Sequence, residues 1–557
     1  MKFDTILDHL GEFGAYQKRL YLLVCLSAIS IAFQTLLPVF YLALPDFRCA
    51  VPGLDNDSYT SQGSSHDVII NGTIPWERDD DGVSTLSECN VYTNLTAGNQ
   101  TRECKSWVYD KATFTSTALA QFNIVCSDKG WRATSNSINF AGSLCGAFFL
   151  GFLSDLIGRK KTFFLSAFFH CASGISLAFA PNFEGFIALR FINGVANAGL
   201  FMSAFVIGVE LVGPSKRVLA GIVIELFWCL GLFILGAVAY GIRNWQHLQL
   251  VLSVPSVLLL FLWWFIPESP RWLLSRGRDA EAEQIIRKAA EVNDVDLPPK
   301  IFDKSTVDLN QPQARVWEMF TTPVLLIRSL IIFLNWFVIS MVYYGLGLNV
   351  QNLSGDIYLN FTIANIVETL AYVICIFFLD RAGRKKLHCG SMMLGGVACL
   401  ATMFPVMYGD SSHAWITTTL SMIGKLGASA AFAIIYVFSA ELFPTVVRNS
   451  GMGASSTFAR VGGIISPFVA DLGLLVEGNL KTALPLVVFG AVTVGAGLLS
   501  LILPETLNRK LPENIEDAKT FGRTNSSSQN YLDTLGGIKS ADKQISGKFK
   551  KIYDEKF

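Results

Sequence analysis

A short charged motif occurs twice in this chain, each time between two long apolar runs. The first copy occupies Gly151 to Lys161, and the second occupies Asp380 to Lys386. Their aspartates are 225 positions apart (380 − 155). Two other features also recur at nearly this offset. Glu210 and Arg217 correspond to Glu441 and Arg448, and Pro267-Glu268-Ser269 corresponds to Pro504-Glu505-Thr506. Self-similarity over such a length predicts two homologous halves.

The apolar runs predict a membrane protein. Of the 557 residues, 51% are hydrophobic and only 16% are charged, which excludes a soluble enzyme of this size. Runs of about twenty apolar residues recur, and each is long enough to cross about 30 Å of hydrocarbon as a helix. We therefore expect an all-α membrane protein whose twelve transmembrane helices form two six-helix bundles. The expected spans are 21–43, 135–153, 162–180, 183–207, 218–241, 248–266, 324–348, 358–379, 387–407, 414–440, 451–474 and 483–503.

The same pattern divides the chain into seven segments. They are an N-terminal segment (1–20), helix one (21–43), a loop domain (44–130), helices two to six (131–266), a central helical segment (267–323), helices seven to twelve (324–503) and a largely disordered tail (504–557). Lysines and arginines cluster after the second and eighth runs and in the central segment, so these sides should be cytoplasmic. Both termini are then cytoplasmic, and the loop domain is outside the cell at the plasma membrane. Residues 1–17 lack a cleavable signal, so helix one is retained.

The loop domain carries two kinds of extracellular feature. Four cysteines predict two disulfides with three alternative pairings: Cys49, Cys89, Cys104 and Cys126. Four sequons predict N-glycosylation: Asn56, Asn71, Asn94 and Asn99.

The repeated motif predicts a charge latch at the cytoplasmic face. A glycine in each copy permits a tight turn between two helices, and the flanking aspartate and cations face acidic partners or lipid phosphate. Ordinary positive-inside anchoring is the alternative, but the aspartate and glycine recur in register, which favours the latch. The candidate gating residues are Asp155, Arg159, Glu210, Arg217, Glu268, Arg271, Asp380, Arg384, Glu441 and Arg448.

Several motifs resemble those of a known family. The paired latches and Pro267-Glu-Ser-Pro-Arg-Trp-Leu-Leu are similar to the major facilitator superfamily. The cysteine-bearing loop, Leu10-Gly-Glu-Phe-Gly, Ala440-Glu-Leu-Phe-Pro-Thr-Val-Val-Arg-Asn and Leu503-Pro-Glu-Thr resemble solute carrier family 22, nearest to insect organic cation transporter proteins and to carnitine and zwitterion transporters. The resemblance covers nearly all of residues 1–511. It implies disulfides between Cys49 and Cys104 and between Cys89 and Cys126.

Charged residues inside the apolar runs are candidates for function, because charge in the bilayer is costly. They are Arg190, Glu225, Glu368, Lys425 and Arg460. A structural salt bridge explains any one of them about as well as a ligand does. We assign Arg190 and Lys425 to structure or gating, and we select Glu225 and Glu368 as carboxylates for an ammonium substrate.

Aromatic residues at helical spacing accompany these carboxylates. Trp228 is three residues after Glu225, and Tyr343 is seven after Trp336, so each pair shares a helix face. Phe201, Phe432 and Tyr436 join the cavity by the resemblance alone. Desolvated cation–π contacts contribute about 0.5 to 2 kcal/mol each. Plain packing is the alternative for all of these rings.

Arg460 makes the charge of the substrate an open question. By the resemblance, organic cation transporters carry an aspartate at this position, whereas carnitine and organic anion transporters carry an arginine. A fixed guanidinium pairs with a carboxylate and repels a pure cation. This favours a zwitterion with its ammonium toward Glu225 and Trp228 and its carboxylate toward Arg460. However, by the same resemblance, insect members named for organic cations also carry an arginine here, and Glu368 could neutralise Arg460, so the substrate charge stays open.

The sequence thus predicts a transporter of small organic cations or zwitterions that works by alternating access and acts as a monomer in the lipid bilayer. No nucleotide-binding motif occurs, so transport runs downhill or on a sodium or proton gradient. No enzyme constellation, resident cofactor, metal or nucleic-acid partner is expected. The alternatives are an organic anion exchanger of the same family and a membrane receptor that does not transport.

Overall fold

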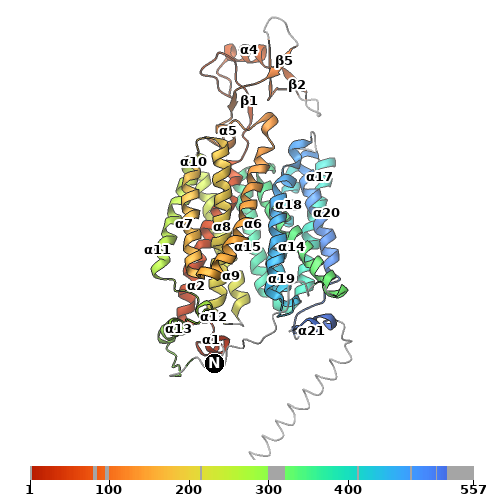
Figure 1. Ribbon diagram of the computed structural model, residues 1–557. Helices are drawn as coiled ribbons and strands as arrows, with labels where there is room; N and C mark the ends of the chain where they lie inside the picture. The colour runs from red at the N-terminus through yellow and green to blue at the C-terminus, as the bar shows by residue number, and fades with distance from the viewer. Residues whose placement is uncertain are drawn as a thin grey trace, which may run out of the picture.

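The computed structural model describes residues 3–78, 84–93, 100–213, 216–298, 301, 320, 322–409, 413–476, 480–509, 511–512 and 514–522. Two helical bundles stand side by side, with a small domain at one end and short helices at the other (Figure 1). We call these the loop-domain end and the latch end. The predicted sequons Asn94 and Asn99, the side chain of Arg217 and most of the tail lie outside what is described.

Each bundle is built from one continuous part of the chain. The first contains α2 (Ala15–Leu36), α3 (Pro38–Tyr41), α6 (Trp131–Ile157), α7 (Arg159–Leu177), α8 (Phe183–Leu211), α9 (Arg217–Gly241), α10 (Trp245–Ser253) and α11 (Leu258–Phe261). The second contains α14 (Pro323–Asn349), α15 (Ile357–Ala382), α16 (Arg384–Ala401), α17 (Met403–Tyr408), α18 (Ala414–Leu442), α19 (Arg448–Ala470) and α20 (Leu480–Ser500). Asparagine and aspartate caps begin α8 and α15, where Asn182 and Asp356 accept backbone N–H bonds.

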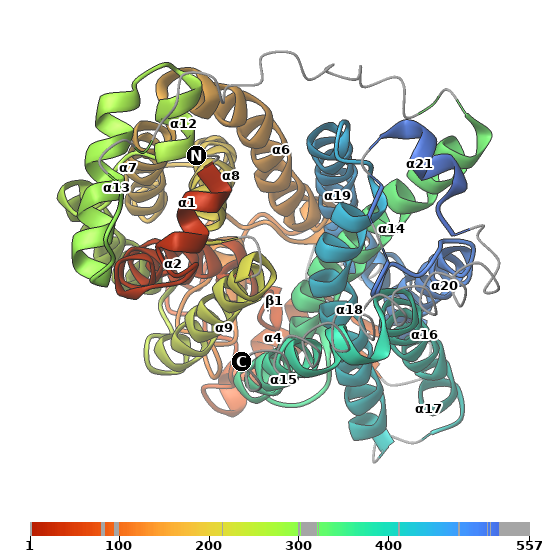
Figure 2. The same cartoon turned by 90° about the horizontal axis from the view of Figure 1, so that it is seen from below.

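Packing within the two bundles follows one scheme. Helix α2 packs on α9 as α14 packs on α19, α6 packs on α8 as α15 packs on α18, and α7 packs on α10 as α16 packs on α20. The bundles meet where α6 contacts α19 and where α9 contacts α15, which are also equivalent pairs. Figure 2 shows the two bundles from the latch end. The repeated motif therefore reflects a repeated fold, as predicted.

Ten helices are long and apolar enough to cross a membrane among the residues described. The third and eleventh predicted spans, α7 and α19, are not among the ten, since α7 starts with Arg159-Lys-Lys and α19 contains Arg460 and several serines and glycines. Both nevertheless pack inside the bundles against α8 and α14. Phe148, Phe149 and Phe152 on α6 are 76%, 67% and 71% exposed, as expected for side chains that face lipid.

Proline interrupts three of the predicted spans. The sixth, expected to be continuous over 248–266, consists of α10, a 3₁₀ turn at Val254–Val257, α11 and a second 3₁₀ turn at Leu262–Trp264. Pro255 lacks the N–H of a regular helix, and its ring clashes with the preceding turn. Pro38 similarly separates α3 from α2, and Pro405 lies within the short α17 that follows α16.

The loop domain is small and held together by disulfides. It contains α4 (Ser64–Thr73), α5 (Ala118–Gln121) and the strands β1 (Phe47–Cys49), β2 (Trp76–Arg78), β3 (Ser84–Leu86), β4 (Asn90–Tyr92), β5 (Thr101–Glu103) and β6 (Trp107–Tyr109). The strands form three antiparallel pairs, β1–β6, β2–β3 and β4–β5. Disulfides join Cys49 to Cys104 and Cys89 to Cys126, the pairing that the family resemblance implied. Crosslinks supplement a core too small to be stable alone.

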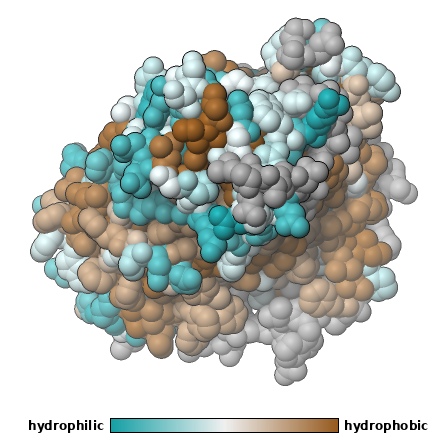
Figure 3. All heavy atoms as spheres, turned by 90° about the horizontal axis from the view of Figure 1, so that it is seen from above, coloured by the Kyte–Doolittle hydropathy of each residue, from teal (hydrophilic) through white to brown (hydrophobic). Residues whose placement is uncertain are grey.

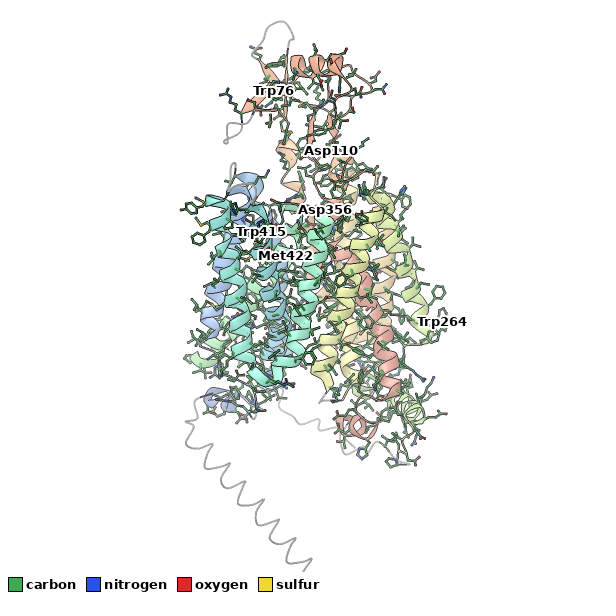
Figure 4. The ribbon with its side chains drawn as sticks, turned by 180° about the vertical axis from the view of Figure 1, so that it is seen from behind. Trp76, Asp110, Trp264, Asp356, Trp415 and Met422 are labelled. Carbon is green, nitrogen blue, oxygen red and sulfur yellow. A yellow bond between two sulfur atoms is a disulfide. The ribbon has the colours of Figure 1, made fainter. Side chains whose placement is uncertain are left out.

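The outer surface agrees with a protein that crosses a bilayer. Hydrophilic side chains gather on the loop-domain face and hydrophobic ones on the flanks below it (Figure 3). Trp264 and Trp415, 74% and 66% exposed, lie at different heights of the bundle, with Trp415 nearer to the loop domain (Figure 4). Tryptophans at both ends of a span mark the two membrane interfaces. The side chains of Asn56 and Asn71, two of the predicted glycosylation sites, are exposed on the loop domain.

Short helices cover the latch end. They are α1 (Phe3–His9), α12 (Pro270–Ser275), α13 (Asp279–Asn293) and α21 (Ile515–Thr520). Helix α1 packs on α13 through Ile6, Leu7 and Ile286, so the N-terminus belongs to the first half. Arg328 of α14 donates hydrogen bonds to the carbonyls of Ala518 and Phe521, which attaches α21 to the second half.

Candidate functional site

A cavity of about 120 Å³ lies between the two halves. It is lined from the first half by α2, α6, α8 and α9 and from the second by α14, α18 and α19. Eight of the nine predicted substrate-binding residues line it: Phe201, Glu225, Trp228, Trp336, Tyr343, Phe432, Tyr436 and Arg460. Glu368 is the ninth and is not part of the lining.

The wall from the first half presents polar groups without protein partners. Glu225 of α9 forms no ion pair within the described part of the chain. In the same wall, the indole Nε1 of Trp228 and the amide Oδ1 of Asn197 are buried and make no hydrogen bond. Buried polar atoms are normally satisfied in native proteins. The first-half wall thus contains two polar atoms, Trp228 Nε1 and Asn197 Oδ1, that no described residue satisfies.

The wall from the second half presents a guanidinium without a carboxylate. Arg460 of α19 donates to the carbonyl oxygen of Ser456 at 2.9 Å and to the Ser456 hydroxyl, and the described residues offer it no acidic partner. Tyr344 and Tyr436 line the same cavity as Glu225 and Arg460. Opposite charges therefore face one cavity from opposite halves.

The aromatic side chains around these charges contact one another. The Trp336 indole donates to the Ser439 hydroxyl at 2.9 Å, and its ring lies 4.5 Å from that of Tyr436 in an edge-on arrangement. Phe432 contacts Tyr436 at 5.7 Å between ring centroids. Fixed rings keep their faces available to a ligand without further loss of rotamer entropy.

Glu368, which the sequence predicts as a carboxylate for an ammonium substrate, is instead part of an ion pair in the structure. Its carboxylate lies 2.9 Å from the Lys425 ammonium, and it accepts hydrogen bonds from the Tyr343 and Tyr372 hydroxyls. Glu368 therefore pairs with Lys425 rather than neutralising Arg460. Arg190, the remaining intramembrane cation, is buried near Tyr41 and donates to the Asn136 side chain at 2.9 Å.

Some lining residues were not predicted from the sequence. Asn139, Phe140, Asn197 and Tyr344 lie in the cavity wall. Asn139 and Asn197 interrupt apolar runs with uncharged amides, and that polarity is the sequence signal that could have located them. The two phenyl rings of Phe140 and Tyr344 give no such signal in a chain with 42 phenylalanines and 15 tyrosines.

At the loop-domain end, hydrogen bonds join the two halves. Arg132 at the start of α6 binds both carboxylate oxygens of Asp471, just after α19, and also donates to the Asn352 side chain at 3.1 Å. Below it, the Ser137 hydroxyl donates to the Ile464 carbonyl at 2.7 Å. Arg132 is 3% exposed, so the guanidinium is sealed between the halves. We call these contacts the outer bridge.

A second contact between the halves is aromatic. Tyr358, at the start of α15, stacks on Phe40 of the first half at 5.6 Å and meets the edge of Tyr240 at the same distance. Its hydroxyl donates to the Thr113 carbonyl at 3.3 Å. Thr113 belongs to the segment that returns from the loop domain, so this domain contacts the closing surface.

At the latch end, the first copy of the motif forms a compact cluster. Arg159 pairs with Asp155 at 2.5 Å and approaches Glu210 at 3.8 Å. The Glu268 carboxylate accepts the backbone N–H groups of Arg159 and Lys160 at the start of α7. We call this set the first latch. Arg271 also acts electrostatically on Glu210.

The second copy reproduces these contacts. Arg384 pairs with Asp380 at 2.9 Å and with Glu441 at 3.1 Å, and Glu505 accepts the backbone N–H groups of Arg384 and Lys385. We call this set the second latch. Burial by itself raises the pKa of Glu505, but four backbone N–H bonds outweigh it and hold that pKa below its usual value. Arg448 donates to the Phe443 carbonyl and is attracted by Glu441.

Both latches depend on a glycine. Gly158 has φ 111° and Gly383 has φ 96°, where residues with a side chain are strained. An added Cβ would lie 2.3 Å from Glu268 at the first position and 2.5 Å from Glu505 at the second. The tight turn and the position of the neighbouring carboxylate thus both require glycine.

The two ends differ in what their contacts join. The outer bridge and Tyr358 connect the halves, whereas each latch lies within one half in the described part of the chain. The cavity is therefore closed toward the loop-domain end, and no described latch contact ties the halves together at the opposite end. Within the described residues, no group of three or more His, Cys, Asp or Glu side chains could hold a metal.

Known proteins match nearly the whole chain. The family model described as "Sugar (and other) transporter" matches residues 84–517. The organic cation transporter protein of Drosophila melanogaster is 40% identical over 562 residues, covering 98% of this chain and all of that protein. The human organic cation/carnitine transporter 2 is 35% identical over 540 residues, covering 92% of this chain and 93% of that one.

Solved structures support the fold. The proton:xylose symporter XylE bound to 6-bromo-6-deoxy-D-glucose superposes with a TM-score of 0.59 at 16% identity, covering 91% of this chain and 99% of that one. Inward open XylE from E. coli gives the same TM-score at 15% identity and covers 90% and 99%. At such identities the likeness establishes the fold alone. Together with the family match and the nearly full-length relatives, which include human solute carrier family 22 member 13 at 35% identity over 93% of each chain, it shows that the chain belongs to the major facilitator superfamily and, within it, to solute carrier family 22.

Proposed function

We propose that this transporter carries small organic cations or zwitterions, with quaternary ammonium zwitterions of the carnitine type as its preferred class. One observation carries the proposal: Glu225 and Arg460 face the same cavity from opposite halves, and neither has a partner of opposite charge among the described residues. A zwitterion supplies both missing charges at once. The names of the relatives, organic cation and carnitine transporters, support the same class.

The proposed pose follows from the two walls. The ammonium group lies at the wall formed by Glu225 and Trp228, where a carboxylate and an aromatic face replace its water. The carboxylate lies at Arg460, whose guanidinium provides two parallel N–H donors. Because the two charges are on different halves, binding favours conformations that keep both walls close. Such a substrate promotes the transition between the two access states.

The proposal also covers the membrane, the orientation of the chain and the energy source. We place the chain in the plasma membrane with its loop domain outside and both termini in the cytoplasm, in agreement with the sequons and the charge distribution. The outer bridge then lies on the extracellular side of the cavity. A net-neutral zwitterion gains nothing from the membrane potential, so accumulation requires a coupled sodium or proton gradient. One chain contributes both walls, which makes the monomer the functional unit.

Uptake by oocytes that express the full chain tests the proposal. The probes are radiolabelled tetraethylammonium, carnitine and para-aminohippurate, each with and without sodium. We expect carnitine to be preferred, tetraethylammonium to be accepted, and para-aminohippurate to be poorest. Preference for para-aminohippurate would establish the organic anion alternative, and saturable binding without uptake of any probe would establish the receptor alternative.

Variants at the two walls sharpen the test. Arg460→Asp should lower carnitine uptake and raise tetraethylammonium uptake, each by about tenfold, because the charge at the carboxylate subsite changes sign. Glu225→Gln should raise the KM for both ammonium substrates. Equal effects of each variant on all three probes would remove these residues from the proposed pose.

A further inference from the structure

Behind the cavity wall of the second half lies a buried ion pair with no assigned role. Glu368 of α15 is 0% exposed and Lys425 of α18 is 3% exposed, and their charged atoms are 2.9 Å apart. Neither residue lines the cavity. Ionic groups at this depth in a membrane protein are costly, and they commonly mark function.

One ring separates this pair from the cavity. Tyr343 lines the cavity, and its hydroxyl donates to Glu368 at 2.5 Å. The Lys425 ammonium lies 3.8 Å from the centroid of the same ring and also approaches the Tyr343 carbonyl at 3.4 Å. Phe432 stacks on Tyr343 at 4.8 Å. The pair therefore contacts, from two sides, a ring that lines the cavity.

The position of the pair has an electrostatic consequence. While Glu368 and Lys425 are paired, their charges cancel, and the charge felt in the cavity comes from Glu225 and Arg460. Removal of either partner would leave one uncompensated charge a single ring away, in a region of low dielectric where it is weakly screened. Lys425 alone would join Arg460 in attracting anions, and Glu368 alone would join Glu225 in attracting cations.

We propose that Glu368 and Lys425 are positioning residues that set substrate charge selectivity: as a pair they hold Tyr343 in place and keep the second-half wall from adding a net charge to the cavity. This inference rests on the proposed function. It replaces direct ligation by Glu368, and it predicts that selectivity follows the sum of the two charges rather than the presence of either residue.

The experiment uses Glu368→Gln, Lys425→Gln and the double variant in the full chain, with the three probes named above. The three variants and the unmodified chain are measured side by side at the same pH. Surface protein is quantified so that KM and maximal rate are separated. Glu281→Gln, in an exposed ion pair with Arg278 on α13, is the matched control.

The ratio of tetraethylammonium to para-aminohippurate uptake is the readout. We expect it to fall about tenfold in Glu368→Gln and to rise about tenfold in Lys425→Gln. The double variant should return to within about twofold of the unmodified chain, and the control should not change it. Opposite shifts with recovery in the double variant are not produced by loss of structure, which would lower the uptake of all probes together.

Two results would overturn the inference. The first is a tetraethylammonium to para-aminohippurate uptake ratio that is the same in both single variants as in the unmodified chain. If the unmodified chain transports the probes, this result refutes the inference but not the proposed function. The second is a double variant whose uptake ratio stays as low as that of Glu368→Gln or as high as that of Lys425→Gln. If Glu368→Gln does not reach the cell surface, the test rests on the other two variants. Lys425→Gln should raise the uptake ratio, and the double variant should return it to that of the unmodified chain. An unmodified chain that moves none of the probes refutes the proposed function, and the inference with it.

Discussion

The two ends of the bundle use similar charged groups for different purposes. At the loop-domain end, Arg132 of the first half is bound to Asp471 of the second, so this ion pair must break whenever the cavity opens in that direction. At the latch end, Arg159 and Arg384 each bind acids of their own half. The outer bridge therefore joins the two halves, whereas each latch joins elements of one half. We expect the bridge to stabilise one access state and the latches to keep each half rigid while the halves rotate. A charged cluster near a membrane interface does not reveal which of these roles it has until its partners are known.

The outer bridge gives the largest expected effect. Arg132→Met leaves the Asp471 carboxylate, whose side chain is 12% exposed, without its partner, and breaking a largely buried pair costs up to about 3 to 5 kcal/mol. This shifts the population toward the state open at the loop-domain end. A cysteine placed at Ser143 in the cavity lining should then react with a membrane-impermeant thiol reagent from outside, and uptake should fall more than about tenfold.

A charge exchange controls for this result. Arg132→Asp combined with Asp471→Arg restores the pair with its ends reversed, and it should protect the Ser143→Cys probe again. Continued protection in Arg132→Met alone would show that the outer bridge does not hold the halves together.

Substitution of the glycines in the latch turns should have the second largest effect. Gly158→Ala places a residue with a side chain in a region of backbone space used almost only by glycine, at a cost of about 1 to 3 kcal/mol, and its Cβ displaces Glu268. We expect about tenfold lower maximal rate with little change in KM. Gly383→Ala should have the same effect through Glu505. Gly151→Ala is the matched control, since an added Cβ there meets open space.

Neutralising the latch carboxylates should have a smaller effect. Glu268→Gln and Glu505→Gln keep the shape but weaken the charge-assisted bonds to the starts of α7 and α16, by about 0.5 to 1.5 kcal/mol. The maximal rate should fall about three- to tenfold in both variants. Uptake kinetics measured with equal surface protein check this, and a large effect in one half alone would mean that the two latches are not equivalent.

The smallest effect is expected at the aromatic contact between the halves. Tyr358→Phe removes the 3.3 Å hydrogen bond to Thr113 but keeps the stacking on Phe40. The apparent KM should change by about twofold or less. Tyr358→Leu also removes the ring contacts and should therefore have the larger effect. If the two variants behave alike, the ring does not contribute to closure.

Much of the fold was predictable because its signals are local. Length and apolarity located the spans, and the repeated motif revealed two equivalent halves with matching latches. The errors were also local in origin, since Pro255 interrupts a helix that the apolar run alone predicts to be continuous. The disulfide pairing followed from the family resemblance, whereas cysteine counting alone left three alternatives.

The candidate site was only partly predictable. Helical spacing placed Glu225 with Trp228, and family resemblance added Phe201, Phe432 and Tyr436. The sequence did not reveal that Glu368 binds Lys425, 57 positions away (425 − 368), or that Arg132 binds Asp471 across 339 positions (471 − 132). Such pairings depend on how helices are rotated and which helices become neighbours.

The sequence alone thus determined that this chain is a duplicated membrane bundle with a charged latch in each half, because apolar length and glycine turns act over short distances. Tertiary structure decided which charges are cancelled and which face the cavity. The reason is physical: inside the bilayer a charge is defined by the partner within a few ångströms, and helix packing rather than chain order brings that partner near.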